Sequence, residues 1–484
     1  MNATWIAFLL YSLAAIALGL KSYRQGTGGS DYWTAGRNLS GTSVGLSISA
    51  GFMSVSWSCV YAVQLFYWYG LGAIWLITIP WLVTLIIIYF LAARYRALPA
   101  FSQPEMVGRR FGPAARKSVA VALAVVFLVW GGAELYVAGV LLAPQLGLSQ
   151  PVMIIIIGLI VASYATLGGF GAVVATDKLQ YLLVALYILT MGYLATKGLS
   201  ETAGGWPDPQ IHAAKSGSSW TSLSSPGLAV ILLTFVAYLP GWVFETDLWL
   251  RVQAAETPAS ARKGILMAIG SALLFVGILP LFIGIGSLAL YPMEGASYPG
   301  AVGFEGEAIF AALVTNYAPP YLVALVAVGL VAAAMSTIDT CVNVMALSIG
   351  YDLTSQATAD IPSVRPRIIT LLSVGAATLF ALYTQSLWDI FYLSSGILTA
   401  AVAAPVAAVF WPRANANGIT ASSVAGFAGV VLAYFGETYW GLGRWEPLWL
   451  AESGLGFIIW GIVAALAGYL IGSRLPGQPV TPAR

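Results

Sequence analysis

Long apolar stretches, separated by short polar segments, fill almost the whole chain. A helix that crosses the bilayer needs about 20 apolar residues. By this rule the pattern predicts thirteen membrane-spanning helices, near residues 4–20, 43–69, 72–93, 118–142, 151–168, 176–196, 227–247, 264–291, 319–350, 366–383, 387–411, 418–436 and 454–472. The segment Glu307–Pro319 is predicted to be a helical arm that does not cross. We therefore expect an all-α polytopic membrane protein with almost no domain outside the membrane.

Composition supports this class and excludes several functions. Of the 484 residues, 59% are hydrophobic and 8% are charged, whereas a soluble globular chain has about 25% charged residues. One histidine and two cysteines are too few for a structural zinc site or a disulfide framework. No set of nucleophile, base and oxyanion donors is visible, so we do not expect an enzyme. Nothing in the sequence indicates a nucleic-acid partner or an obligatory protein partner.

The distribution of basic residues predicts how the chain is oriented. Lysine and arginine concentrate in the cytoplasmic loops of membrane proteins. If the N-terminus is outside, all but three of the 21 basic residues fall in segments predicted to be inside, and the exceptions are Lys197, Lys215 and Arg444. The opposite orientation would place nearly all of them outside. We therefore predict an outer N-terminus, an inner C-terminus and an odd number of crossings.

A polar cluster interrupts the apolar segment near 319–350. Ser336, Thr337, Asp339 and Thr340 occupy little more than one helical turn, and positions three and four apart share a face of a helix. Such groups at membrane depth usually face a polar interior, and oxygen ligands suit a hard cation. We predict a site for a small monovalent cation. The alternative is a packing patch, in which the hydroxyls bond to the preceding turn.

The composition of the second predicted span argues against one continuous helix. Its first part, Ser43–Trp57, contains five serines and two glycines in fifteen residues, which favours a break near Ala50–Met53. A break at membrane depth is tolerated only where it is buried or lines a cavity, and broken helices build ion and solute sites in secondary transporters. The alternative is close packing of small residues against a neighbouring helix.

Four motifs, in this order along the chain, resemble those of the sodium/solute symporter family, which includes bacterial proline and sialic acid transporters and the sodium/glucose cotransporters. The motifs are Ser30–Arg37, Gly168–Gln180, Ala332–Asp339, and Gly396 with Pro405, Phe410–Arg413 and Gly418. The resemblance implies a single transporter domain with a LeuT-type fold in the plasma membrane, most simply a bacterial inner membrane. Two inverted five-helix repeats would occupy 43–196 and 227–411, with an extra helix at 4–20 and two more within 418–472.

The resemblance also implies sodium-coupled symport of a small polar organic solute by alternating access; the solute could be an amino acid, an amine or betaine-like compound, a carboxylate or a sugar. The implied sodium ligands are the backbone carbonyls of Ala50, Met53 and Ala333 and the hydroxyls of Ser336 and Thr337. Two other readings remain open. One is a proton-coupled permease on the same fold, and the other is a membrane sensor that binds a solute without moving it.

A second ion position is a further hypothesis from the resemblance. Asp177, Asp339 and Thr340 could hold a second sodium ion or form an inner relay for the departing ion, because two neighbouring carboxylates repel unless a cation or a proton lies between them. In the proton-coupled alternative, the two aspartates would carry the protons. The structural alternative is that Asp177 caps a helix and Asp339 pairs with a basic residue.

Candidate solute contacts lie on the broken helix and on the spans expected to face it. They are Phe52, Ser54, Trp57, Gln64, Glu134, Tyr238, Trp242 and Trp388. Glu134 lies one turn from Trp130, and a carboxylate beside an aromatic face suits an ammonium group. This favours an amino acid, amine or betaine-like solute over a free sugar, unless Glu134 pairs within the protein or is protonated. Glu245 and Asp247, just before Arg251, are interpreted as a salt-bridged gate or cap.

Overall fold

The regular structure of the described residues is helical. The computed structural model describes residues 3–25, 32–33, 35–98, 100, 102–292, 306–354, 364–384 and 387–476. Its helices are α1 (Ala3–Gln25), α3 (Gly41–Phe52), α4 (Ala62–Tyr69), α5 (Thr78–Arg96), α6 (Gln103–Phe111), α7 (Pro113–Leu146), α8 (Gln150–Gly198), α9 (Leu228–Ala237), α10 (Leu239–Val243), α11 (Thr246–Ala254), α12 (Pro258–Ala272), α13 (Leu279–Leu290), α14 (Gly306–Tyr317), α15 (Pro320–Leu347), α16 (Val364–Tyr383), α17 (Leu387–Ile397), α18 (Ala404–Ala408), α19 (Ala416–Trp440), α20 (Leu448–Ala451) and α21 (Gly456–Gly472).

These helices confirm the predicted all-α membrane architecture. Within the described ranges, nine helices are long and apolar enough to cross a membrane, and a bent pair beginning at Gly41 adds a tenth if it is counted as one span. One of the nine, Gln150–Thr202, contains two of the predicted spans, and the shorter apolar helices Tyr392–Ala408 and Gly456–Gly472 coincide with two others. Helix α14 lies where the non-crossing arm was predicted. The count of thirteen crossings stays a prediction.

Helix α8 joins two predicted spans through one non-helical residue. Gly169 has φ 55° and ψ −148°, a conformation that is open to glycine and closed to almost every other residue. A Cβ atom at this position would also lie 2.4 Å from the backbone oxygen of Tyr32. The sequence pattern predicted a loop between the two spans. The structure instead resumes the helix immediately, because a single glycine accommodates the change of direction.

The predicted break in the second span is present, at Met53 and Ser54. Helix α3 ends at Phe52, and Ser54 has an extended backbone with φ −67° and ψ 158°. The Ser54 hydroxyl accepts a hydrogen bond of 2.9 Å from the backbone N–H of Trp57, which caps the π-helical segment Val55–Tyr61 that leads into α4. The two halves of the span meet at an angle of 60°.

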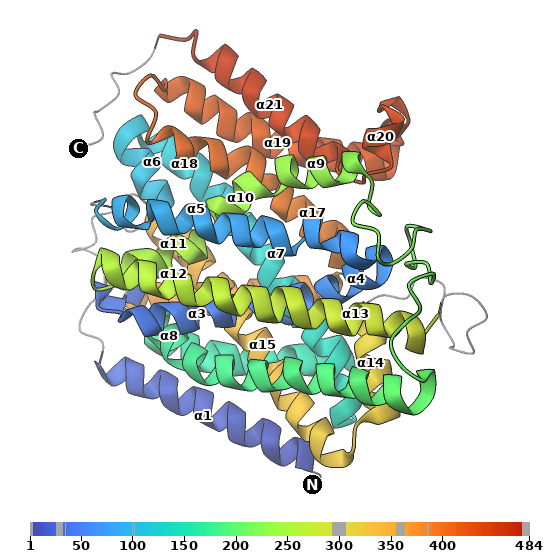
Figure 1. Ribbon diagram of the computed structural model, residues 1–484. Coiled ribbons are helices and arrows are strands. Elements are labelled where there is room, and N and C mark those ends of the chain that lie inside the picture. The colour runs from blue at the N-terminus through green and yellow to red at the C-terminus, as the bar shows by residue number, and fades with distance from the viewer. Residues whose placement is uncertain are drawn as a thin grey trace.

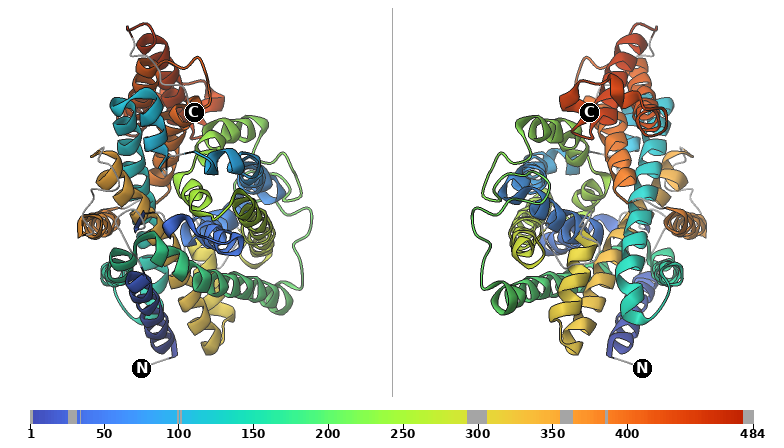
Figure 2. Two further views of the ribbon diagram at one scale, coloured as in Figure 1. Left: turned by 90° about the vertical axis from the view of Figure 1, so that its left-hand side faces the viewer. Right: turned by 90° about the vertical axis from the view of Figure 1, so that its right-hand side faces the viewer.

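Helix α15, which carries the candidate ion ligands, lies at the centre of the bundle. It packs against α7 and α8, while α3 packs against α8 and α12. Almost every residue of α15 from Val326 to Leu347 is buried. Helix α1 lies along α8 at one side, and α19 and α21 pack against each other at the opposite side, as Figures 1 and 2 show. The broken helix and α15 therefore meet in the interior of the protein.

Candidate functional site

The predicted sodium ligands lie where the end of α3 meets the middle of α15. The Ser336 hydroxyl is 3.1 Å from the carbonyl oxygen of Ala50 and 2.8 Å from that of Ala333. The Thr337 hydroxyl is 3.3 Å from the carbonyl oxygen of Ala333 and 3.5 Å from that of Gly51. The structure thus brings the oxygens of four predicted ligands together and adds Gly51, which the sequence analysis did not include.

The fifth predicted ligand, Met53, lies at the break itself, with a backbone that is no longer helical (φ −82°, ψ 43°). The bonds of Ser336 and Thr337 to Ala333 are those that a simple packing patch would also make. A simple packing patch would not require both hydroxyls to approach the carbonyl oxygens of α3. Neutral carbonyl and hydroxyl oxygens from two helices are the kind of ligands that a hard cation takes.

A second polar cluster surrounds the Arg251 guanidinium, about one helical turn from the first. Asp177, on α8, accepts a hydrogen bond from the Ser47 hydroxyl and lies 3.4 Å from Arg251 Nη2. Arg251 Nε is 2.7 Å from Ser47 Oγ, and Nη2 is 2.8 Å from Thr340 Oγ1. Arg251 and Asp177 are both completely buried. This arginine, on α11, therefore connects the broken helix α3 with α8 and α15.

Asp339 has different neighbours. Its Oδ2 accepts a hydrogen bond of 2.7 Å from the Tyr164 hydroxyl and lies 3.5 Å from the Thr176 hydroxyl. The Thr340 hydroxyl, 3.5 Å from Asp339 Oδ1, stands between this carboxylate and Arg251. Within the part of the chain that the structure describes, Asp177 forms an ion pair with a basic residue and Asp339 does not. The role of the two aspartates in ion movement stays a prediction.

Asp247 and Glu245 differ in their surroundings. Asp247 Oδ2 lies 3.3 Å from Arg251 Nη1, which is the salt bridge that the sequence predicted here. Glu245 instead lines the central cavity, and its Oε2 has no hydrogen-bond partner among the described residues. The side chains of the two acids are nevertheless hydrogen-bonded to each other, so they connect the central cavity with the cluster around Arg251.

A small cavity of about 50 Å³ lies beside the break. Its lining residues come from the broken helix, α5, α7, α10, α15 and the start of α11, and are Gly51, Phe52, Ser54, Ser56, Trp57, Trp81, Trp130, Glu134, Trp242, Glu245 and Thr337. Ligand pockets in proteins typically have volumes of about 300–1,000 Å³, so the cavity must widen to admit an organic solute. Five of the predicted solute contacts line it: Phe52, Ser54, Trp57, Glu134 and Trp242.

Glu134 is hydrogen-bonded to the second half of the broken helix. Its Oε2 is 3.2 Å from the backbone nitrogen of Val55, and its Oε1 is 3.2 Å from that of Ser56, whose hydroxyl also donates to it. A carboxylate at a helix N-terminus is stabilised by free N–H groups and by the helix dipole. Glu134 is 2% exposed. The carboxylate therefore caps the helix as well as lining the cavity.

Stacked aromatic rings form one wall of the cavity. Trp81 and Trp242 stack with their centroids 5.1 Å apart, and Tyr238 also stacks with Trp242, at 5.4 Å. Trp57 meets Trp242 edge-on at 5.4 Å. Tyr238 thus supports the wall from behind. Trp81 was missed by the sequence analysis because a tryptophan within an apolar span carries no sign of the face it occupies.

Gln64 is not among the residues that line this cavity. Gln64 is completely buried, and its Oε1 accepts a hydrogen bond of 3.1 Å from the backbone nitrogen of Gly306 at the start of α14. Gln64 therefore joins two helices. Trp388 belongs to α17, but its side chain lies outside the described residues.

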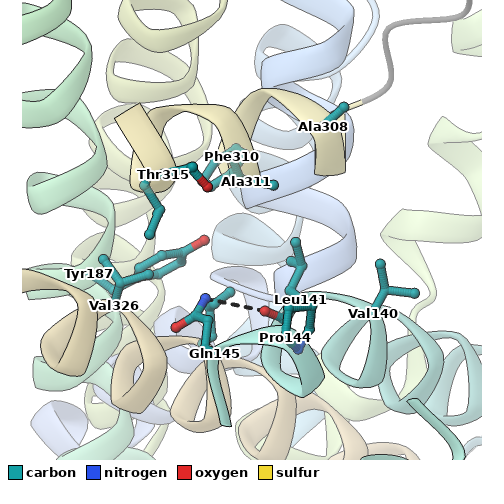
Figure 3. A pocket seen from close by; sticks show the side chains of 12 residues that line it. Val140, Leu141, Pro144, Gln145, Tyr187, Ala308, Phe310, Ala311, Thr315 and Val326 are labelled. Carbon is teal, nitrogen blue, oxygen red and sulfur yellow. Dashed lines mark hydrogen bonds between the residues drawn. The ribbon is translucent and has the colours of Figure 1, made fainter. Parts of the chain in front are cut away.

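A larger cavity of about 260 Å³ lies between α7, α8, α14 and α15 (Figure 3). Its lining is apolar apart from a few polar side chains, among them Gln145, whose Nε2 is 3.2 Å from the Leu141 carbonyl oxygen. Among the described residues that line this cavity, none carries a charge. It is also not lined by the broken helix, so its chemistry suits ion-coupled binding less well than that of the central cavity.

The chain matches the model of the Sodium:solute symporter family over residues 32–426. It is 23% identical to the sodium/sialic acid symporter NanT of Aliivibrio fischeri, over 97% of this chain and 92% of that one. It is 28% identical to the sodium/glucose cotransporter of Vibrio parahaemolyticus, over 54% of this chain and 51% of that one. A solved structure of a Na⁺-coupled sialic acid symporter, substrate-bound and outward-open, has a TM-score of 0.77 and 16% identity, with 99% of both chains covered.

Proposed function

Because the chain belongs to the sodium:solute symporter family, we propose that the solute it carries bears an ammonium group. The protein is a multi-pass membrane protein and a sodium-coupled symporter of a small organic solute, and it is not an enzyme. One observation carries the proposal about the solute. The central cavity is lined by four tryptophans and by the carboxyl groups of Glu134 and Glu245, and none of the described residues that line it is basic.

This lining favours a positively charged group. Tryptophan is the aromatic side chain that attracts cations most strongly, and cages of aromatic rings bind quaternary ammonium groups. A buried carboxylate, when it is ionised, adds a negative charge where little water screens it. Glu134 has both oxygens hydrogen-bonded to the broken helix, whereas Glu245 Oε2 has no such partner among the described residues. Glu245 is therefore the better candidate for direct contact with the ammonium group.

An anionic solute fits this cavity poorly. In secondary transporters with broken helices, the N-terminal end of a half-helix receives the anionic group of a substrate. Here the carboxylate of Glu134 already occupies that position, at the backbone nitrogens of Val55 and Ser56. The solute named for the sialic acid symporters is a carboxylate sugar. Its carboxylate would meet two acidic side chains and no basic one in this lining.

The coupling ion is proposed to bind at the α3–α15 contact. Its ligands would be the carbonyls of Ala50, Met53 and Ala333 and the hydroxyls of Ser336 and Thr337, and the approach of both hydroxyls to α3 supports this. We further propose two inverted repeats, at 43–196 and 227–411. The ion would then join one helix of each repeat. An ion shifts a conformational equilibrium only when it binds one state more tightly, and an ion held between two repeats meets that condition when they separate.

Several contacts support the proposed thirteen crossings, outer N-terminus and inner C-terminus. Arg96 Nε is 2.7 Å from the Ala255 carbonyl oxygen, which joins two segments predicted to be inside. The backbone nitrogen of Leu71 is 2.7 Å from the Trp220 carbonyl oxygen, which joins two segments predicted to be outside. In Figure 1, α1 begins near the bottom of the picture and runs toward the left, and α21 also ends toward the left. An odd number of crossings requires the two termini to lie on opposite sides of the membrane.

The test is uptake of radiolabelled choline into proteoliposomes that contain the full chain. We expect accumulation driven by an inward sodium gradient, inhibition by tetramethylammonium and no inhibition by sialic acid. Uptake of labelled sialic acid without uptake of choline would overturn the proposed solute class. Accumulation driven by a proton gradient without sodium would favour the proton-coupled permease, and sodium-dependent binding without any flux would favour a sensor.

A further inference from the structure

Arg251 is an unusual residue for the interior of a membrane protein. Its side chain is completely buried, and a buried guanidinium is costly unless every donor is satisfied. The group has five N–H donors, and the structure provides five acceptors. Nε donates to Ser47 Oγ, Nη2 is near Asp177 Oδ2 and Thr340 Oγ1, and Nη1 is near the carbonyl and a carboxylate oxygen of Asp247. The guanidinium is therefore held on all sides.

Three of these acceptors form a set that an alkali cation could also use. They are the hydroxyls of Ser47 and Thr340 and the carboxylate of Asp177, at 2.7, 2.8 and 3.4 Å from the guanidinium nitrogens. Each comes from a different helix, α3, α15 or α8. Hydroxyl and carboxylate oxygens are ligands of hard cations. The positive charge among these oxygens is that of the Arg251 guanidinium, which is part of the protein and not a bound ion.

This set stands beside the proposed sodium ligands. Thr340 follows Ser336 by one turn of α15, and its hydroxyl donates to the Ser336 carbonyl at 2.9 Å. Ser47 precedes Ala50 by about one turn of α3. A Cβ atom built on Gly51, whose carbonyl faces Thr337, would lie 3.6 Å from Arg251 Nη2. The same two helices therefore present two successive groups of oxygens, and the guanidinium lies within the second.

We propose that the guanidinium of Arg251 permanently occupies this second cation position, so that each transport cycle moves one sodium ion. This inference rests on the proposed sodium site between α3 and α15. Because the guanidinium is attached to α11, it balances the charge of Asp177 without being released to either side. A sodium ion in the same position would have to displace a cation that makes five hydrogen bonds. The fixed arginine thus sets the ion stoichiometry.

The experiment counts bound radioactive sodium by equilibrium dialysis of the purified full-length protein. We expect one sodium ion per wild-type chain and one per R251K chain, because lysine keeps the charge. R251Q removes the charge and is expected to bind a second sodium ion. The Hill coefficient for sodium, which cannot exceed the number of sites, should exceed one only in R251Q. Size-exclusion chromatography establishes that each variant is folded.

A paired substitution separates this inference from the proposed sodium site. S336A combined with T337A should abolish binding in the wild-type background and leave one sodium ion in the R251Q background. Two sodium ions per wild-type chain, or one per folded R251Q chain, would overturn the role of Arg251 and leave the first site intact. A wild-type chain that binds no sodium would overturn both proposals. The wild-type and S336A/T337A counts remain decisive even if R251Q does not fold.

Discussion

Replacing Glu134 with glutamine tests how the break in the second span is held. The glutamate carboxylate accepts hydrogen bonds from the backbone nitrogens of Val55 and Ser56, each at 3.2 Å, and from the Ser56 hydroxyl. Glutamine has nearly the same shape but only one acceptor oxygen. Its amide NH₂ group would face one of these N–H donors and could not accept a hydrogen bond from it. The substitution therefore removes one acceptor and the negative charge while leaving the volume almost unchanged.

The expected loss of stability follows from these contacts. A buried donor left without an acceptor costs about 1–3 kcal/mol, and loss of a partly buried charge at a helix N-terminus costs about 1 kcal/mol more. Together these terms predict that Glu134→Gln lowers the free energy of unfolding by about 2–4 kcal/mol. Loss of the charge should also weaken the binding of choline, since the carboxylate lines the cavity. Sodium binding without solute should persist.

The assay is thermal unfolding of the purified protein in lipid nanodiscs, with and without choline. Glu452→Gln is the control, because this exposed acid lies outside the central cavity and the broken helix. Glu134→Gln should unfold at a clearly lower temperature than the wild type in the absence of choline, and the control should not. If Glu134→Gln is as stable as the wild type, the carboxylate does not hold the break and the argument about the occupied anion position fails.

Three further substitutions test other parts of the account. Ser336→Ala should raise the sodium concentration for half-maximal choline uptake at least about tenfold, because the loss of a ligand worth about 1.4 kcal/mol has that effect. The control Thr420→Ala in α19 should leave this sodium concentration unchanged. Gly169→Ala should abolish folding, because its Cβ would lie 2.4 Å from a backbone oxygen, whereas Gly171→Ala meets nothing within 4 Å; size-exclusion chromatography compares the two. Trp242→Leu should weaken choline binding several-fold through loss of a cation–π contact, and calorimetry that finds unchanged affinity would contradict the proposed cage.

Much of the fold could be predicted from the sequence because length and hydropathy decide which segments are buried in a membrane. The polar residues of the segment near 319–350 also stood out, since hydroxyls and a carboxylate in hydrocarbon need an explanation. The break at Met53 and Ser54 followed from the serine and glycine content of its span. These signals are local, and a single stretch of chain carries each of them.

The rest depends on which segments meet in three dimensions. Arg251 was assigned to a gate with its neighbour Asp247, but nothing near it in the sequence indicates that it also reaches Ser47, Asp177 and Thr340. Gln64 was expected to contact solute because polar groups in apolar spans often do. Its partner is a backbone nitrogen of α14, more than two hundred residues away. A side chain's partner cannot be read from its own surroundings in the sequence.

The most direct test of the central claim is the entry of radioactive sodium into proteoliposomes when choline is added outside. The account predicts that choline stimulates sodium entry, that sialic acid does not, and that S336A raises the sodium concentration needed for half-maximal stimulation at least about tenfold. The account would be contradicted if the rate of sodium entry did not change when choline is added. It would also be contradicted if choline uptake proceeded equally well when potassium replaces sodium at fixed pH.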